Sequence, residues 1–373
     1  MTPPRRPAAP SVGRLGRLCG CATTAGSLLV LALAVVACGS EQDNPPAAEP
    51  ADSPPAAAKP AGNVLELGGE AEGVAVDPAD GLAAVAFRDP DELRILDLER
   101  ERAVSRIPLP GPARHLEMAQ DGTTVLVPIE YTDELARFDL APIAARGSGP
   151  EDGSGGSGTR NAIGTGDFPH DAVEAANGTI FVGDEGADTV TVIRDGKVSG
   201  SIDVPEQPGG VATSGDVLAV VSVAAREISF YDTTTLERLA VLDAGAGPSH
   251  VVAGDDGLFY VADTGGDAIL VYDATPTGGG EPRFLDRANV PGSPYGLAID
   301  NEHGRLYVTQ AARNRLVALE LTGAAPRAVG SYPTVRQPNS AGVDERSGEV
   351  IVAGRTGGEV QILDPEAEEA AGT

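Results

Sequence analysis

The sequence predicts an all-β fold, a seven-bladed β-propeller of four-stranded antiparallel blades that is closed by the N-terminal strand of the domain. Three observations lead to this prediction. A short motif recurs seven times, the 48 glycines and 30 prolines mark many tight turns, and no stretch after residue 62 repeats its apolar residues at a helical period. A repeat of about 40 to 45 residues with four strands per unit is typical of propellers.

Residues 1–38 are predicted to be an export signal. A basic stretch ends near Arg17, and a 13-residue apolar run follows from Ala25 to Ala37. This run is short for a bilayer span and has the length of a signal h-region. It ends in Val-Val-Ala-Cys, which resembles the bacterial lipobox, so we expect Cys38 to be lipidated. An ordinary signal peptide with an unrelated cysteine is the alternative.

The lipobox resemblance implies a protein anchored to the cell membrane through lipid on Cys38, on its extracytoplasmic side. The other two cysteines, Cys19 and Cys21, lie in the leader, so we expect no disulfide in the mature chain. Residues 39–62 contain six prolines and seven alanines, which predicts an extended tether. At about 3.1 Å per residue, such a tether would reach roughly 70 Å.

The charge balance excludes one class of partner. After Cys38 the chain has 55 acidic and 23 basic residues, a net charge of −32, because four arginines and no acid precede that cysteine. Such a surface repels nucleic-acid phosphates, so we expect no nucleic-acid partner. A cationic partner or a divalent ion would suit this charge, although an acidic surface can also serve solubility alone.

Seven repeats divide residues 63–365. Each begins with an anchor, a Pro-x-Gly-like motif followed by an apolar strand, and successive anchors are 41, 57, 39, 40, 46 and 44 residues apart. Residues 147–158, "GSGPEDGSGGSG", account for the longest spacing and are predicted to be a flexible loop between the third and fourth strands of the second blade. The anchors begin at Ala71, Pro112, Pro169, Pro208, Pro248, Pro294 and Pro338.

The last repeat stops after its third strand. Residues 63–69, "NVLELGG", are predicted to supply the missing fourth strand by pairing with residues 359–364, which would close the ring and leave no exposed sheet edge there. Residues 366–373 form an acidic, alanine-rich tail. The third strands often end in an aspartate, for which we expect a turn-forming role; these residues are Asp97, Asp139, Asp232, Asp273 and Asp364.

The second strands, such as "GLFYVADT" at 257–264 and "RLYVTQA" at 305–311, carry a family resemblance. Residues 63–365 resemble the YVTN/YncE group of seven-bladed propellers, within a wider clan of NHL proteins, gluconolactonases, lactonases and virginiamycin B lyases. The resemblance implies the fold, but propellers host enzymes, binders and scaffolds alike. Glu72 and Asn339 resemble calcium-ligating residues of gluconolactonases, yet that family has six blades, and the second and fourth anchors here offer Ala113 and Gly209 instead.

Propeller topology predicts where a site would be. The anchors and the loops between second and third strands lie on one face beside the central channel. The anchors contribute Glu72, His115, His170, Asp171, His250, Tyr295 and Asn339. The loops contribute Arg88, Glu130, Tyr131, Asp184, Glu185, Asp263, Gln310 and Arg355.

Three of the four histidines lie in anchors, which motivates a chemical hypothesis. With Asp171, Asp184 or Glu185, they could bind a divalent metal or act as acid and base; the catalytic candidates are His170, Asp171 and His250, and the metal candidates are His170, His250 and Asp184. The alternative is that these histidines only line the channel, because they occupy different positions in their motifs and strand side chains alternate in direction.

Two functions remain open from the sequence. The first is a monomeric ligand-binding or protein-interaction module outside the membrane, with a small ligand, a cell-wall component or a protein as its partner. The second is a metal-assisted lactonase, lyase or hydrolase that uses the same face. We find no Gly-x-Ser-x-Gly elbow, P-loop or cysteine-based zinc motif, so the sequence favours the binding module.

Overall fold

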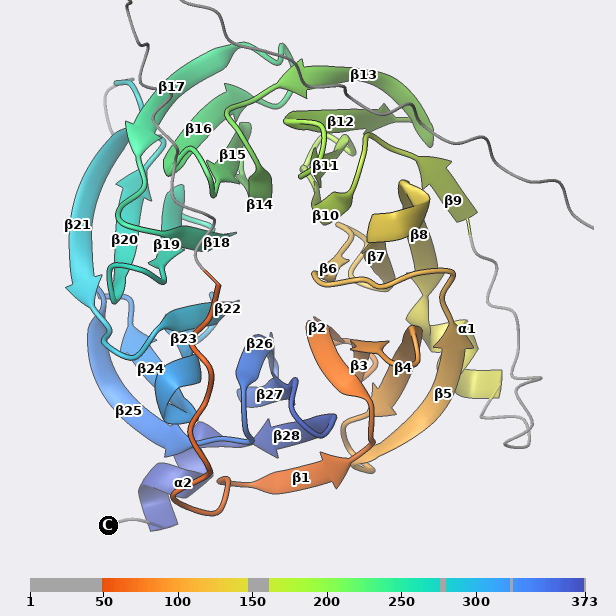
Figure 1. Cartoon of the computed structure of the whole chain (residues 1–373), viewed down its shortest axis with the longest axis vertical. Coiled ribbons are helices and arrows are strands. Elements are labelled where there is room, and N and C mark those ends of the chain that lie inside the picture. Colours follow the sequence, from red (N-terminus) through yellow and green to blue (C-terminus); the bar gives the residue numbers. More distant parts are fainter. Residues whose placement is uncertain (1–48, 147–160, 276–279, 323–324, 372–373) are drawn as a thin grey trace, which may run out of the picture. The chain divides into compact units, whose positions relative to one another are not determined.

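Seven four-stranded antiparallel sheets surround a central channel in the computed structural model (Figure 1), which confirms the predicted seven-bladed propeller. The structure describes residues 49–146, 161–275, 280–322 and 325–371. The signal peptide, Cys38 and the loop at 147–158 lie outside the described residues. No helix among the described residues is long and apolar enough to cross a membrane.

Each blade runs from an inner strand at the channel to an outer strand at the rim. Blade 1 contains β2 (Glu70–Asp77), β3 (Leu82–Arg88), β4 (Glu92–Asp97) and β5 (Arg102–Pro108); blade 2 contains β6 (Glu117–Met118), β7 (Thr124–Ile129), β8 (Glu134–Asp139) and β9 (Asn161–Gly164). Blade 3 contains β10 (Pro169–Glu174), β11 (Ile180–Asp184), β12 (Thr189–Arg194) and β13 (Lys197–Asp203); blade 4 contains β14 (Pro208–Ser214), β15 (Val217–Ser222), β16 (Glu227–Asp232) and β17 (Arg238–Asp243). Blade 5 contains β18 (Pro248–Ala253), β19 (Leu258–Asp263), β20 (Ala268–Asp273) and β21 (Arg283–Asn289); blade 6 contains β22 (Pro294–Asp300), β23 (Arg305–Gln310), β24 (Arg315–Glu320) and β25 (Arg327–Pro333).

Blade 7 combines the two ends of the domain. It contains β26 (Pro338–Asp344), β27 (Glu349–Gly354), β28 (Glu359–Leu363) and, as its outer strand, β1 (Asn63–Glu66). β1 runs antiparallel to β28, with Asn63 opposite Ile362 and Glu66 opposite Glu359. The strand is shorter than the predicted 63–69 because Gly68 and Gly69 have φ angles of 71° and 85°, which an extended strand does not allow.

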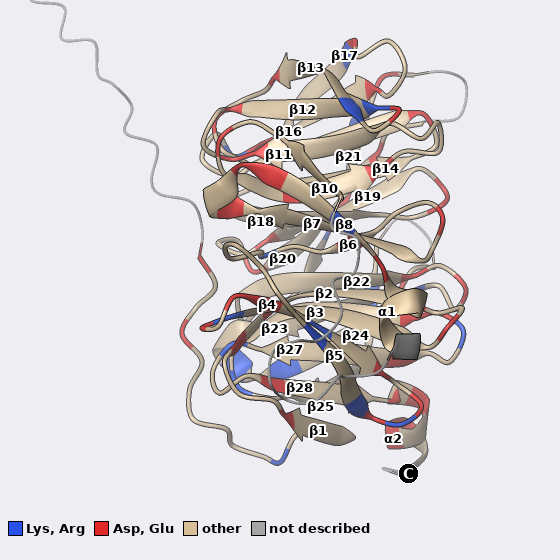
Figure 2. Cartoon of the chain, turned by 90° about the vertical axis from the view of Figure 1, so that its right-hand side faces the viewer, with Lys and Arg blue, Asp and Glu red and all other residues tan. Residues whose placement is uncertain are grey.

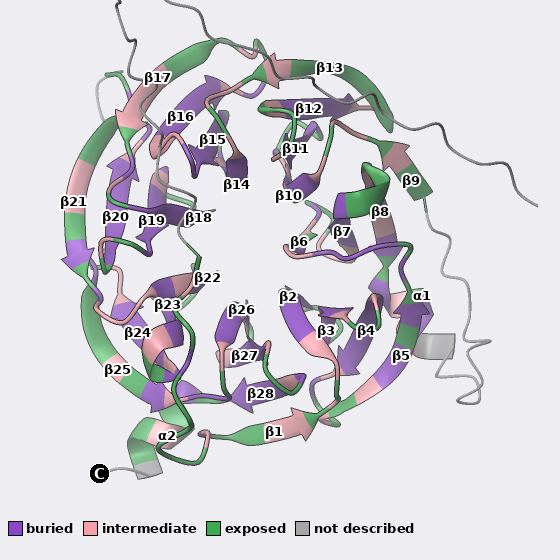
Figure 3. Cartoon of the chain, viewed as in Figure 1, coloured by how far each residue is buried: buried purple, intermediate pink, exposed green. Residues whose placement is uncertain are grey.

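The core lies between the blades. Seven clusters of buried apolar side chains each join two neighbouring blades, including one cluster shared by blades 7 and 1. Middle strands are covered on both faces, so their sequences are largely apolar, as in β15, whose six residues are all buried and all apolar except Ser222. Outer strands such as β13 are mostly exposed (Figure 3). Acidic residues are spread widely over the domain (Figure 2).

A polar link between neighbouring blades recurs four times. In each case, the last residue of the loop between the second and third strands adopts a positive φ, which Asp and Asn tolerate better than most residues. The side chain of this residue accepts a hydrogen bond from the backbone N–H of the residue directly before the next anchor proline. The link ties each of these four anchors to the preceding blade. The pairs are Asp133 with Phe168 (3.1 Å), Asp188 with Gln207 (2.8 Å), Asp267 with Ser293 (2.9 Å) and Asn314 with Gln337 (3.1 Å).

Two short α-helices were not predicted. α1 (Leu140–Arg146) follows β8, and its buried Leu140 and Ile143 pack in the cluster between blades 1 and 2. α2 (Pro365–Ala371) occupies most of the predicted tail, and it is capped by Asp364, whose side chain accepts hydrogen bonds from two backbone N–H groups. Seven residues offer too few apolar positions to show a helical period. The turn-forming role predicted for Asp364 is confirmed, and Asp97, Asp232 and Asp273 also accept backbone N–H groups of their own turns.

Residues 49–62, which we call the N-terminal segment, lie against the domain. The free tether predicted from the sequence did not include such contacts. Ser53 is 5% exposed, and its hydroxyl donates to the carbonyl of Ala311, while its N–H donates to Gln337 Oε1 at 2.8 Å. Asn314 also donates to the carbonyl of Pro54. The segment therefore crosses blades 6 and 7 from near the channel to β1 (Figure 1). A proline-rich segment buries little apolar surface, but its backbone can still form hydrogen bonds.

Candidate functional site at the channel mouth

We call the group formed by Glu72, Arg88, Arg114, Glu130, His170, Glu185 and Arg355 the mouth. These residues come from inner-strand starts and from the ends of second strands or the loops after them, as the topology predicts. Inner strands approach one another closely at this level. A Cβ atom on Gly73 would lie 2.4 Å from the Arg114 carbonyl oxygen, and one on Gly296 would lie 2.8 Å from that of Asn339. Glycine in these anchors therefore permits backbone contact between neighbouring blades.

Three histidines meet at the inner side of the mouth, and we call His115, His170 and His250 the histidine layer; His170 belongs to both groups. The ring centroid of His115 lies 4.8 Å from that of His170 and 4.4 Å from that of His250. Nε2 of His250 lies 3.0 Å from Nε2 of His115, and Nδ1 of His250 lies 2.9 Å from the Tyr295 carbonyl oxygen. Inner strands shift register at the anchors, for example between Pro169 and Asp171 and between Pro248 and Val251, which redirects side chains that simple alternation would separate.

These contacts determine the tautomers of two rings. A carbonyl oxygen only accepts, so Nδ1 of His250 carries a proton and its Nε2 accepts from Nε2–H of His115. Burial lowers the pKa of His250 to about 4 and, with the neighbouring histidines, lowers the pKa of His115 well below its ordinary value. Both rings are therefore uncharged at neutral pH.

His170 is the charged member of the histidine layer. Its Nδ1 lies 2.9 Å from Glu185 Oε2 and 3.6 Å from Glu130 Oε1. Burial alone would lower the pKa of His170, but the two carboxylates outweigh burial and raise this pKa to about 9. Burial would likewise raise the pKa of Glu185, yet His170 and Gln207 lower it to about 2. The pair is an imidazolium and a carboxylate over most of the pH range.

Three arginines surround these groups. Glu130 is 1% exposed, and its two oxygens contact Arg88 Nη2 at 2.8 Å and Arg114 Nε at 3.0 Å. Arg355 Nε lies 3.0 Å from Glu72 Oε1. Burial raises the pKa of Glu72 in spite of Arg355 and its other cationic neighbours. The mouth is thus a partly buried cluster of alternating charge, in which Glu72, Glu130 and His170 are buried and the Arg355 side chain is 41% exposed.

The mouth retains unused hydrogen-bonding capacity. Several buried atoms have ion-pair neighbours but no aligned hydrogen bond. Arg88 Nε has no hydrogen-bond partner either. Native proteins leave few such atoms, and they often mark places where a water, an ion or a ligand binds. A hollow of about 750 Å³ opens beside Arg355 and is bordered by Glu49, Asp52, Glu70 and Gln337. The atoms without an aligned partner are Glu72 Oε1, Arg88 Nε, Glu130 Oε1, His170 Nδ1 and Glu185 Oε2.

Other predicted site residues have structural partners instead. Asp184 accepts from Gly166 N–H and from the hydroxyls of Thr189 and Thr191, so it does not join His170 and His250 as the metal hypothesis supposed. Asp263 accepts three backbone N–H groups, and Gln310 donates to the carbonyl of Pro291. Both hold loops of the mouth face.

Three predicted residues lie at the edges of the site. Asp171 lines the channel, and its two oxygens accept from the N–H groups of Ala172 and Val211. Tyr131 is 70% exposed and packs edge-on against Phe168. Asn339 is buried and also lines the channel. No three His, Cys, Asp or Glu side chains in the described part of the chain are grouped so that they could hold one metal ion.

Arg114, Gln207 and Glu117 were not among the predicted site residues. Arg114 lies in the second anchor directly before His115, so its position in the repeat was a usable signal. Gln207 directly precedes the fourth anchor, and its amide donates to Glu185 Oε1. Glu117 lies three residues beyond Arg114, where the sequence resembles an ordinary strand start.

Comparison with known proteins supports the fold alone. No protein-family model matches the chain, and no curated protein matches it. Kuenenia stuttgartiensis hydrazine synthase is a similar structure, with a TM-score of 0.64, 17% identity and coverage of 80% of this chain and 96% of that one. Virginiamycin B lyase from Staphylococcus aureus has a TM-score of 0.61, 14% identity and coverage of 80% and 98%. A chain of the mitotic checkpoint complex has a TM-score of 0.65, 11% identity and coverage of 85% and 98%.

Proposed function

We propose that this protein is a lipid-anchored, extracytoplasmic binding module of the YVTN/YncE type that holds a small polar ligand at the mouth. The observation that carries the proposal is the partly buried cluster of opposite charges, in which Arg88 Nε has no hydrogen-bond partner and four further buried atoms meet only their ion-pair neighbours. Charged groups of this kind, fixed by one another before a ligand arrives, lose little freedom on binding. A ligand with both donors and acceptors would complete their hydrogen bonds.

The lipobox ending at Cys38 and the acidic surface support the location and the partner class. A small ligand or an exposed cell-wall component could reach the mouth from outside the membrane. A protein partner is the other form of the same proposal, because one structural neighbour comes from a multiprotein checkpoint complex. The hollow beside Arg355 favours the small ligand.

The test is a melting-shift screen of the full chain with amino acids, hexoses and N-acetylated amino sugars. A ligand at 100 times its Kd stabilises the folded state by about 2.7 kcal/mol, which raises the melting midpoint by several degrees. Arg355→Ala should abolish the shift of any true mouth ligand. Arg327→Ala, at an arginine whose side chain is 72% exposed and paired with Glu320, is the matched control. Equal responses of both variants would refute a mouth site.

The second candidate is a metal-assisted lactonase, lyase or hydrolase. One observation favours it: Nδ1 of His250 faces a carbonyl and Nδ1 of His170 faces a carboxylate, as in metal-binding histidines whose Nε2 is the ligand. Elemental analysis of the purified protein, with melting curves before and after chelation, separates the two candidates. Stoichiometric metal that is lost in His170→Ala or His250→Ala would favour the enzyme, and indifference to chelator and added ions would favour the binding module.

A further inference from the structure

The N-terminal segment begins beside the mouth. Gln337 Nε2 donates to the Ala51 carbonyl at 3.1 Å, and the hydroxyl and N–H of Ser53 bond to the loops of blades 6 and 7. These bonds hold the residues before Ser53 over the same face. Glu49 borders the hollow beside Arg355, so the segment forms part of the wall of the space in which we place the ligand.

Glu49 brings a carboxylate close to Arg114. Burial would lower the pKa of Arg114, but Glu130 and weaker negative charges that include Glu49 raise it. Burial, and next the charge of Glu49, raise the pKa of the Tyr295 hydroxyl. Glu49 is exposed, and no group in the described part of the chain forms a hydrogen bond or an ion pair with its carboxylate. It therefore acts on these side chains without being bonded to them.

The mouth has fewer carboxylates in contact than it has cations to pair. Arg355 contacts two carboxylates, those of Glu70 and Glu72. The other three cations share two carboxylates. These groups are Arg88, Arg114 and His170 with Glu130 and Glu185. Arg88 Nε has no hydrogen-bond partner and the Arg114 side chain is 26% exposed, so this part of the mouth has room for one more anion.

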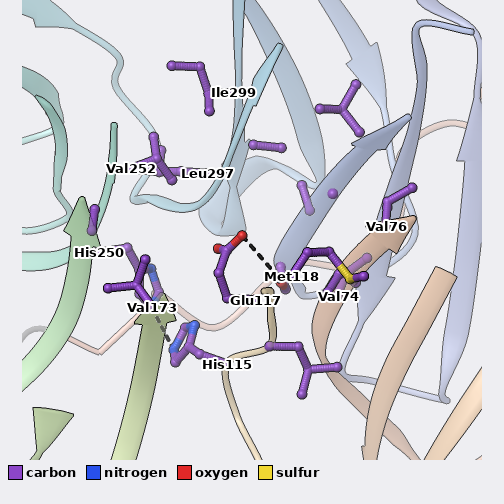
Figure 4. Close-up of a pocket in the computed structure, with 18 of the residues that line it drawn as sticks. Val74, Val76, His115, Glu117, Met118, Val173, His250, Val252, Leu297 and Ile299 are labelled. Atoms are coloured by element: carbon purple, nitrogen blue, oxygen red, sulfur yellow. Dashed lines mark hydrogen bonds between the residues drawn. The ribbon is translucent and has the colours of Figure 1, made fainter. Parts of the chain in front are cut away.

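The central channel, on the other side of the histidine layer, offers no such charge. His115 and His250 line it and contact each other (Figure 4), and both rings are uncharged at neutral pH. The side chains that line the channel, all of them in the described ranges, include no lysine or arginine. An anion therefore finds its positive partners at the mouth.

We propose that the ligand of the mouth carries a carboxylate, which takes the place of Glu49 beside Arg114 and displaces the start of the N-terminal segment. The inference rests on the function proposed above and names the chemical class of its ligand. A carboxylate in contact with an arginine gains charge-assisted hydrogen bonds that Glu49 does not make. An acid that enters the hollow meets the like charges of Glu49 and Asp52, so the segment in its place weakens the binding of an acid.

The first measurement is calorimetric titration of the full chain with pairs of compounds that differ in an acidic group. The pairs are glucuronate with glucose, N-acetylmuramate with N-acetylglucosamine, and glutamate with glutamine. We expect at least one of the acids to bind, one per chain, and about tenfold or more tightly than its neutral counterpart, because a charge-assisted bond to arginine separates the two.

Two variants test the displacement. Glu49→Gln removes a like charge and should tighten the binding of the acid roughly two- to fivefold, whereas Glu237→Gln, at an exposed residue between β16 and β17, should change nothing. Ser53→Ala removes two hydrogen bonds of the segment and should also tighten the binding, because a larger fraction of molecules then has an open mouth. Ser199→Ala, which removes one hydrogen bond on the exposed strand β13, is the matched control.

Several results would overturn the inference. They are equal or weaker binding of the acid in every pair, unchanged affinity for the acid in Glu49→Gln or Ser53→Ala, or an equal change in the control variants. Melting curves check that each variant is folded. If Ser53→Ala is unfolded, Ala51→Pro loosens the same segment, because it removes the N–H that donates to Ser293 Oγ at 3.0 Å.

The same experiments separate this inference from the proposed function. If no acid binds but a neutral compound gives a melting shift that Arg355→Ala abolishes, the inference fails and the binding site at the mouth stands. If no compound shows an effect that depends on Arg355, both fail.

Discussion

Gln361 offers a sharp test of how the two ends of the domain are held together. This β28 side chain is fully buried and makes three hydrogen bonds. Its amide donates to the carbonyls of Ala61, at 2.7 Å, and Pro333, at 3.1 Å, and its oxygen accepts from Val335 N–H at 3.1 Å. It thus joins the N-terminal segment, the end of blade 6 and the entry to blade 7.

Replacing Gln361 with leucine keeps the volume and removes these bonds. The Pro333 carbonyl retains its bond from Ala61 N–H at 2.9 Å, but Val335 N–H and the Ala61 carbonyl lose their partners. A buried group without a partner costs about 1–3 kcal/mol, so the loss of two partners in Gln361→Leu should lower the free energy of unfolding by about 2–6 kcal/mol. For a domain of this size, about 2 °C per kcal/mol gives a fall in melting midpoint of about 4–12 °C.

Differential scanning calorimetry of the full chain measures this change. Gln120→Leu makes the same replacement at an exposed glutamine of blade 2 and should shift the midpoint by about 1 °C or less. Gln361→Glu is a second probe, because it places a carboxylate oxygen against two carbonyl oxygens and should destabilise at least as much at neutral pH. A midpoint of Gln361→Leu that matches that of Gln120→Leu would refute the reasoning.

Three further predictions address other parts of the chain. Glu185→Gln should move the pKa of His170 from about 9 towards its ordinary value of 6.5, as followed by NMR titration. Because a raised histidine pKa stabilises the fold below pH 6.5 and this stability is lost as the pH rises through about 9, Glu185→Gln should cost more at pH 6 than at pH 9.5; equal losses at both pH values would contradict the pair. Deleting residues 63–66 removes the partner of β28 and should lower the melting midpoint by about 10 °C, whereas unchanged melting would show that β1 is dispensable. Cys38→Ala should release the protein from membranes, and membrane retention of this variant without lipid label would contradict the anchor.

The repeat was readable from the sequence because each blade repeats one chemical pattern. The anchor prolines, the apolar second strands and the terminal aspartates recur at fixed places, and the structure confirms seven blades at those places. The gathering of anchor residues on one face followed from topology alone.

The partners within the site were not predictable in the same way. His115, His170 and His250 occupy different positions in their motifs, and their contact depends on register shifts that the sequence does not reveal. Asp184 and Glu185 are neighbours in sequence, yet one holds a loop and the other pairs with His170. Whether Asp184 or Glu185 faces the mouth depends on where the backbone turns, and a shift of about one residue would exchange the two side chains.

The place of β1 in the chain has a mechanical consequence. β1 directly follows the N-terminal segment. If that segment made no contacts with the domain, any pull from the preceding 48 residues would reach β1, the outer strand of blade 7, and separate it from β28 one residue at a time. The contacts of Ser53 with Ala311 and Gln337 transfer that load to blades 6 and 7 before it reaches β1. These hydrogen bonds would therefore carry the load before β1 does. The force needed to unfold the ring would depend on them rather than on the weakest strand pair.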